Sequence, residues 1–158
     1  QNALMAIYAA YLHGIHPKDS FAALKDFKGV KRRFETIYKD NDMTIIDDFA
    51  HHPTSIESTI AAAKDCFDSK ILGIIELGSN TMSGGFHGDN LQNSSRSLDR
   101  TCWLNLSGVP GESYEFTSVD SLLEDIKNNL DEFDVILIMS NKDSKKISEP
   151  LIELIKSK

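Results

Sequence analysis

One short stretch of the sequence, Asp47 to Thr54, concentrates side chains that can do chemistry. It reads Asp-Asp-Phe-Ala-His-His-Pro-Thr, so two carboxylates end an apolar run and two histidines follow at once. Adjacent Asp and His side chains can hold a divalent metal or orient a carboxylate-bearing ligand. Neighbours at a strand end point in different directions, so all four cannot bind one ion. In the alternative interpretation, which involves no function, Asp47 and Asp48 are solvated residues at the strand end, and His51 and His52 belong to an N-capping turn.

Two more polar segments follow apolar runs. Leu77 to Gly88 contains Ser79, Asn80 and Thr81 as neutral hydrogen-bonding groups, and Ser140 to Lys146 is polar throughout. Taken alone, the first of these segments is typical of an ordinary surface loop. Ligands of parallel sheets bind beyond the carboxyl ends of the strands, so we expect any site to draw on all three segments.

Lys31, Arg32 and Arg33 form a local basic patch at the expected junction between the helical start of the chain and the sheet domain. Arg33 could reach a phosphate across a cleft, and a solvated basic hinge is the alternative. The sequence contains neither a G-x-x-x-x-G-K-[ST] nor a G-x-G-x-x-G motif, so it shows no self-contained phosphate cradle.

The elements that position these residues alternate between strands and helices. The pattern predicts an apolar, buried helix over residues 2–12 and a short amphipathic helix over 20–27. It then predicts a strand with Phe34, Thr36 and Tyr38 on one face, and a helix over 54–67 with Thr54 as N-cap and Glu57 as capping-box partner. The remaining strands are expected at 43–49, 70–76, 101–107, 114–117 and 134–140, and the remaining helices at 90–98, 119–130 and 147–156. This order predicts an α/β fold with a Rossmann-like, mostly parallel sheet flanked by helices.

Composition narrows the functional class. The chain has 158 residues, 24 Asp and Glu against 17 Lys and Arg, and a net charge of −7, which argues against nucleic acid as a partner. No apolar run is long enough for a membrane span. Cys66 and Cys102 lack metal-ligand spacing, and we interpret both as buried, small hydrophobic residues. Their small number is consistent with a reducing cytoplasm. Because the sequence starts within an expected helix at Gln1, we expect it to be a piece of a longer chain.

Several segments resemble the Mur ligase family in the family's own order. QNALMAIYAA is similar to the helix that closes its central ATP-binding domain, FKGVKRRFE to the junction, and IIDDFAHHPTSI to the opening of its C-terminal domain. The form D-D-F-A-H-H-P is that of members acting on UDP-N-acetylmuramate. ELGSNTM and DVILIMSN resemble the E-P-R-S-N-T-M loop and V-x-x-M-S-N strand of the branch that attaches a murein peptide.

The resemblance implies a helical tail of the central domain over residues 1–33 and a C-terminal peptide-substrate-binding domain over 34–158. It implies a cytoplasmic ligase of peptidoglycan recycling that joins UDP-N-acetylmuramate to L-alanyl-γ-D-glutamyl-meso-diaminopimelate through an acyl-phosphate. ATP and Mg²⁺ would be held mainly by preceding domains of the same chain. This fragment alone would be inactive.

The resemblance also implies roles for individual residues. Asn2 matches an adenine contact, Arg33 an arginine near the ATP phosphates, and Asp48 an acid near the ribose. Arg33 and His51 are then the catalytic candidates, with His51 placing the incoming peptide or the acyl-phosphate. The substrate-binding candidates are Phe49, His51, His52, Ser79, Asn80, Thr81, Ser140 and Asn141, and no residue is implied as a metal ligand.

Two positions depart from the family pattern. Gly78 stands where the family has an arginine, and a Gly-rich stretch is replaced by Lys142, Asp143, Ser144, Lys145 and Lys146. Either the lysines take over carboxylate binding or the peptide preference has changed. Two other functions remain open: a metal-dependent phosphoesterase using the Asp-Asp and His-His cluster, and a non-catalytic binding module on the same fold.

Overall fold

The computed structural model describes residues 2–76, 89–104 and 114–157, and the chain divides into two compact units, Gln1–Val30 and Lys31–Lys158. The division places the whole basic group Lys31 to Arg33 in the second unit. In the described part of the chain, no helix is both long and apolar enough to cross a membrane.

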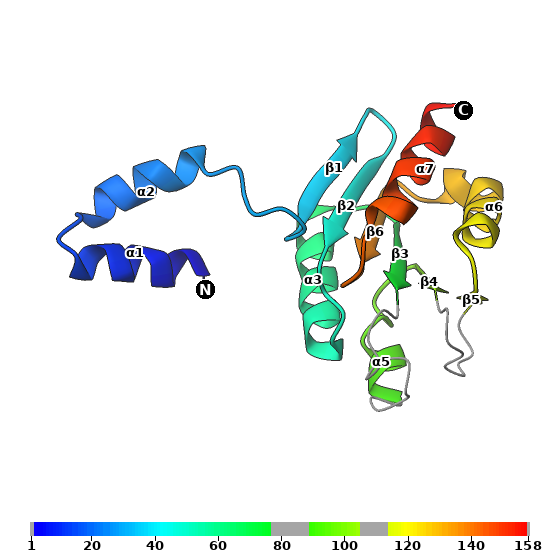
Figure 1. Ribbon diagram of the computed structural model, residues 1–158, viewed down its shortest axis with the longest axis horizontal. Coiled ribbons are helices and arrows are strands. Elements are labelled where there is room, and N and C mark those ends of the chain that lie inside the picture. Colours follow the sequence, from blue (N-terminus) through cyan, green and yellow to red (C-terminus); the bar gives the residue numbers. More distant parts are fainter. Residues whose placement is uncertain (1, 77–88, 105–113, 158) are drawn as a thin grey trace. The chain divides into compact units, whose positions relative to one another are not determined.

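The first unit is a helical hairpin of α1 (Asn2–Leu12) and α2 (Pro17–Asp26), shown in blue in Figure 1. Gly14 adopts a left-handed φ of 84° in the turn, and the His16 side chain caps α2 by accepting the Lys18 N–H at 3.2 Å. The prediction that α1 is buried is wrong for the described unit, because none of its residues is buried. Its apolar side chains point all round the helix, and one short partner helix covers only a strip of them.

The second unit is built on a six-stranded sheet in the order β1-β2-β6-β3-β4-β5. All neighbouring strands are parallel except β1 and β2, which form an antiparallel hairpin. The strands are β1 (Glu35–Lys39), β2 (Thr44–Asp48), β3 (Ile71–Glu76), β4 (Arg100–Leu104), β5 (Tyr114–Phe116) and β6 (Val135–Met139). The predicted mostly parallel, Rossmann-like α/β fold is confirmed.

Helices cover both faces of this sheet (Figure 1). The central strands are buried along their length, so successive apolar residues enter opposite cores. On one face, Ile46 and Leu137 pack with α3 (Pro53–Cys66) and α5 (Asp89–Asn93). On the other face, Ile45 and Ile136 pack with α6 (Val119–Asn129), η1 (Leu130–Glu132) and α7 (Lys145–Lys156).

The start of α3 differs from the predicted cap. His52, not Thr54, is the N-cap, and Pro53 occupies the first helical turn. The hydroxyl of Ser55 accepts the backbone N–H of His52 at 3.1 Å and that of His51 at 3.3 Å, so Ser55 replaces Glu57 as the capping partner. The helix therefore begins nearer to β2 than the sequence indicated.

The structure also differs from the predictions at strand β1, at Cys66 and in helix α5. A β-bulge between Thr36 and Tyr38 breaks the alternation, so Phe34 packs against the α3 side and Tyr38 against the α6 and α7 side. Cys66 is exposed at the end of α3, where the helix faces solvent, whereas Cys102 is buried as predicted. Helix α5 is shorter than the predicted 90–98.

Candidate functional site

The carboxyl ends of three central strands bring together residues that are far apart in the sequence. The N–H of Ser140, after β6, donates to the Asp48 carbonyl at the end of β2 at 3.1 Å. The Ser140 hydroxyl donates to the carboxylate of Glu76 at the end of β3 and accepts the Lys142 N–H at 2.9 Å. Two of the three predicted segments, Asp47 to Thr54 and Ser140 to Lys146, therefore meet at one edge of the sheet.

Asp48 is buried and its carboxylate is bound within the chain. One oxygen accepts the Phe34 N–H at 2.7 Å, and the other accepts the Ala50 N–H at 2.7 Å and the Thr59 hydroxyl at 3.3 Å. Backbone donors of this kind stabilise a charged carboxylate. Asp48 thus ties the start of the unit and the start of the His51 loop to strand β2.

Asp47 points to the other side of the sheet. One of its oxygens accepts the Ser144 hydroxyl at 2.7 Å and lies 3.5 Å from the Arg32 Nε, while the other is buried and has no hydrogen-bond partner among the described residues. Burial raises the pKa of Asp47 above its ordinary value, with a further rise from Glu35, although Ser144 and Arg32 act in the opposite direction. The two neighbouring aspartates therefore have different surroundings and do not converge on one point.

The ring of Phe49 contacts three side chains of the site that can carry charge. The guanidinium carbons of Arg32 and Arg33 lie 5.1 and 5.3 Å from the centre of its ring, and the His51 ring meets it edge-on at 5.4 Å. The His51 Nδ1 is 3.0 Å from the Phe49 carbonyl. Because a carbonyl only accepts, this hydrogen bond places a proton on Nδ1 and leaves Nε2 as the acceptor of a neutral imidazole.

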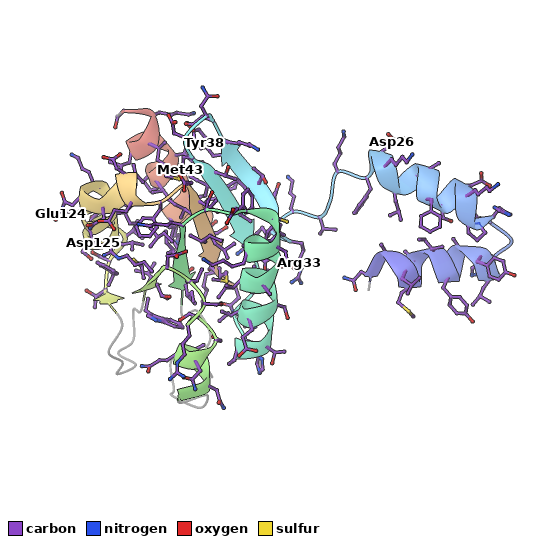
Figure 2. All side chains as sticks on the ribbon, turned by 180° about the vertical axis from the view of Figure 1, so that it is seen from behind. Asp26, Arg33, Tyr38, Met43, Glu124 and Asp125 are labelled. Atoms are coloured by element: carbon purple, nitrogen blue, oxygen red, sulfur yellow. The ribbon has the colours of Figure 1, made fainter. Side chains whose placement is uncertain are left out.

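Arg33 contributes a guanidinium group that can reach a ligand. Its side chain is exposed, and Figure 2 labels it at one end of the β1–β2 hairpin, with Tyr38 and Met43 toward the other. An exposed guanidinium beside an imidazole suits an anionic oxygen such as that of a phosphate or carboxylate. The arrangement can orient such a group and stabilise charge on it.

The same geometry gives no support to a metal centre. Among the residues that the structure describes, no three His, Cys, Asp or Glu side chains are grouped to hold a metal ion. The Asp48 oxygens are engaged by the chain, and Asp47 faces away from them. The phosphoesterase hypothesis therefore lacks a ligand set at the cluster on which it was based.

Comparison with protein families matches residues 32–142 to the one described as "Mur ligase, glutamate ligase domain". The match covers more than half of the chain and includes every group of the site just described, apart from Ser144. The chain belongs to the Mur ligase family.

Members of this family and their solved structures are similar to the chain over most of its length. The chain is 33% identical to the UDP-N-acetylmuramate--L-alanyl-gamma-D-glutamyl-meso-2,6-diaminoheptandioate ligase of Haemophilus influenzae, over 99% of this chain and 38% of the relative. The Escherichia coli enzyme of the same name is 35% identical over 89% of this chain and 34% of its own. A crystal structure of a murein peptide ligase from Psychrobacter arcticus superposes with a TM-score of 0.74 at 37% identity, covering 98% of this chain and 36% of that one. The chain thus spans under two fifths of these relatives' length.

Several predicted Mur ligase site residues lie together. Arg33, Phe49 and His51 form one cluster. Asp48 adjoins it, because its carboxylate accepts the N–H of Ala50 in the same loop. His52 is exposed at the start of α3. Their roles toward nucleotide and peptide stay predictions.

Other predicted residues are placed differently. Ser140 is fully buried and its hydroxyl is engaged by Glu76 and Lys142. Asn141 has a buried side-chain oxygen for which residues 2–76, 89–104 and 114–157 supply no hydrogen-bond partner. Asn2 is exposed on α1 of the first unit. Ser79, Asn80, Thr81 and the departure Gly78 lie outside the described residues.

Three residues at this edge of the sheet, Glu76, Arg32 and Ser144, were not predicted as site residues. Glu76 follows an apolar strand as Asp48 does, so the same rule that singled out Asp48 could have found it. Arg32 and Ser144 gave less signal, because their contacts to Asp47 depend on the turn before β1 and on the position of α7.

Proposed function

We propose that the full-length protein is an ATP-dependent amide-bond-forming ligase that joins UDP-N-acetylmuramate to a murein peptide. The observation that carries this proposal is the Arg33, Phe49 and His51 cluster at the carboxyl edge of the sheet, within a family match whose relatives carry that ligase name. Residues 34–158 would be the peptide-binding domain, and residues 1–33 the tail of a preceding ATP-binding domain.

The reaction has two balanced steps. A carboxylate oxygen of the muramate attacks the γ-phosphorus of ATP, which releases ADP and leaves an acyl-phosphate. The peptide amine then attacks the acyl carbon, the carbon–oxygen bond to phosphate breaks, and the amine loses a proton. Catalysis of this kind depends on positioning and charge stabilisation, which Arg33 and His51 would supply.

The residues present fit part of the nucleotide. Arg33 has an exposed guanidinium, which is the kind of group that binds a phosphate. Asp48, the residue expected near the ribose, is buried and both of its oxygens already accept hydrogen bonds from the chain, so its support for nucleotide binding is to hold the Phe34 and Ala50 backbone in place. No described residues form a cage for Mg²⁺, so the preceding domains would hold it with most of the ATP. Use of ATP and a nucleotide sugar would place the activity in the cytoplasm.

The function is tested on the full-length protein by measuring ADP release. We expect rapid release when UDP-N-acetylmuramate and the L-alanyl-γ-D-glutamyl-meso-diaminopimelate tripeptide are both present, and little or none when either is omitted or when L-alanine replaces the tripeptide. ADP release with L-alanine alone would contradict the peptide assignment. Absence of release under every condition would favour the non-catalytic binding module.

The loop after β6 is proposed to bind a carboxylate of the peptide. Lys142 and Lys145 are exposed there, in the stretch that stands where the family pattern is Gly-rich. Replacing both, Lys142→Met with Lys145→Met, should raise KM for the tripeptide about 10-fold while KM for ATP stays unchanged. Lys127→Met, an exposed lysine on α6, is the matched control. An unchanged KM for the tripeptide would assign the carboxylate to other residues.

A further inference from the structure

The backbone on both sides of Arg33 is held in place although its side chain is exposed. The carbonyl of Arg32 accepts the Phe49 N–H at 2.9 Å, and the Phe34 N–H donates to Asp48 at 2.7 Å. These groups belong to the two peptide units that flank the Arg33 Cα. The main chain of Arg33 is therefore fixed to the end of β2, while its guanidinium lies beside Phe49 and is exposed.

The conformation held in this way is an unfavourable one. Arg32 and Phe34 have φ values of 57° and 52°, in the left-handed region that residues with a Cβ rarely adopt. Such a conformation is strained, so it persists only where the surroundings enforce it. The Arg32 N–H donates to the Glu35 carboxylate at 2.8 Å, which fixes the preceding peptide as well.

The Arg32 side chain supplies further contacts that hold this turn. Its Nη2 donates to the Ser140 carbonyl at 2.6 Å, and its Nε lies 3.5 Å from the Asp47 oxygen that also accepts the Ser144 hydroxyl. Its guanidinium lies over the Phe49 ring that Arg33 also contacts. One side chain thus links the turn to β2 and to the end of β6, and Asp47 connects it in turn to Ser144 at the start of α7.

We propose that Arg32 is a positioning residue, which acts on the reaction through Arg33. Arg32 holds the left-handed turn against the carboxyl edge of the sheet, so that the Arg33 guanidinium meets the anionic group of the ligand at a fixed place. Its own guanidinium is engaged by Ser140, Asp47 and Phe49 and is only partly exposed. The proposal deepens the proposed function and rests on it for the role of Arg33.

A double-mutant cycle on the full-length protein tests the proposal. Arg32→Met should lower kcat by about 10-fold to 100-fold, since a displacement of about 1 Å can cost that much. Arg33→Met should lower kcat further. The double variant should match Arg33→Met alone, because a residue that acts through Arg33 has no effect once Arg33 is gone. Lys39→Met, at the far end of β1, is the control expected to keep wild-type kcat.

Two kinetic results would overturn the proposal. One is a wild-type kcat in Arg32→Met, and the other is a double variant whose loss equals the product of the two single losses. Arg32→Lys should give an intermediate kcat, because one ammonium cannot donate to Ser140 and also lie flat on Phe49. If Arg32→Met does not fold, the same cycle with Arg32→Lys decides the question.

Amide hydrogen exchange in the 158-residue chain provides a readout that does not need ligation. The Phe34 and Phe49 amides should be protected in the wild type and exchange at least about 10-fold faster in Arg32→Met, with Leu137 in β6 unchanged. Unchanged protection of both amides would refute the positioning role. If both amides exchange faster in Arg32→Met but the wild-type protein shows no ligation, the proposed function fails while the positioning of Arg33 by Arg32 stands.

Discussion

At the scale of single residues, Phe49 organises the candidate site. Its ring lies against Arg32, Arg33 and His51, and its N–H and carbonyl both make hydrogen bonds within the cluster. Cation–π contacts of this kind are worth about 0.5–1 kcal/mol at exposed positions. Phe49 therefore fixes the relative positions of two cations and an imidazole.

The two cysteines should differ in reactivity. Burial raises the pKa of the Cys102 thiol to about 11, whereas Cys66 is exposed. Because the thiolate is the reactive form, folded protein at pH 8 should release one equivalent of product with a disulfide reagent, and two after unfolding.

Cys66→Ser should abolish the fast phase and serves as the control. Two fast equivalents in the folded wild type would show that Cys102 is accessible.

The sequence indicated the chemistry of Asp47 and Asp48 and their different directions, but not the groups that each carboxylate contacts. Both end an apolar strand, so their placement beside the histidines could be predicted. Their opposite directions follow from strand geometry, but the partners Phe34, Thr59 and Ser144 come from three other elements. Sequence spacing does not contain these contacts.

At the scale of elements, Asp99 connects α3 to the start of β3. Its carboxylate accepts the Ile71 N–H at 2.8 Å and the Lys64 ammonium at 2.6 Å. Partial burial raises its pKa, but these two groups outweigh burial and hold the pKa below the usual 3.8. A carboxyl whose pKa is lowered by folding stabilises the fold above its unfolded pKa and loses that contribution as pH falls through the folded pKa.

Asp99→Asn should therefore reduce the free energy of unfolding by about 1 kcal/mol at pH 7 and by less at pH 3. Denaturant titrations of both proteins at the two pH values measure this difference. Asp47, with its raised pKa, has the opposite pH trend but is present in both proteins and cancels. A difference that is equal or larger at pH 3 would contradict the assignment.

Helix α6 and strand β1 show where element prediction succeeds and fails. Ser118 precedes an amphipathic repeat and is the observed N-cap, with its hydroxyl accepting the Ser121 N–H at 3.2 Å. Such a local signal is readable from sequence. The bulge between Thr36 and Tyr38 depends on pairing with β2, so local alternation predicted the wrong faces.

At the scale of the whole molecule, an exposed stretch of chain connects the two units. Lys28 and Lys31 are exposed, and Gly29 between them has a left-handed φ of 87°. Trypsin should cut first after Lys28 or Lys31, because exposed connections between compact units are cleaved before packed elements. The resulting sheet unit should persist on a gel.

Mass spectrometry of the first product locates the cut. The segments 77–88 and 105–113 contain no Lys or Arg, so they cannot compete for trypsin. A first cut within β1 or α3 would contradict the division into units.

The molecule as a whole is interpreted as the peptide-binding end of a ligase that forms an acyl-phosphate. This interpretation is tested most directly by transfer of ¹⁸O from labelled muramate carboxylate in the full-length protein. The carboxylate oxygen that attacks ATP leaves with phosphate, so one ¹⁸O should appear in inorganic phosphate for each amide bond formed. Amide formation with unlabelled phosphate would contradict the acyl-phosphate, and absence of both ADP and amide would contradict the ligase itself.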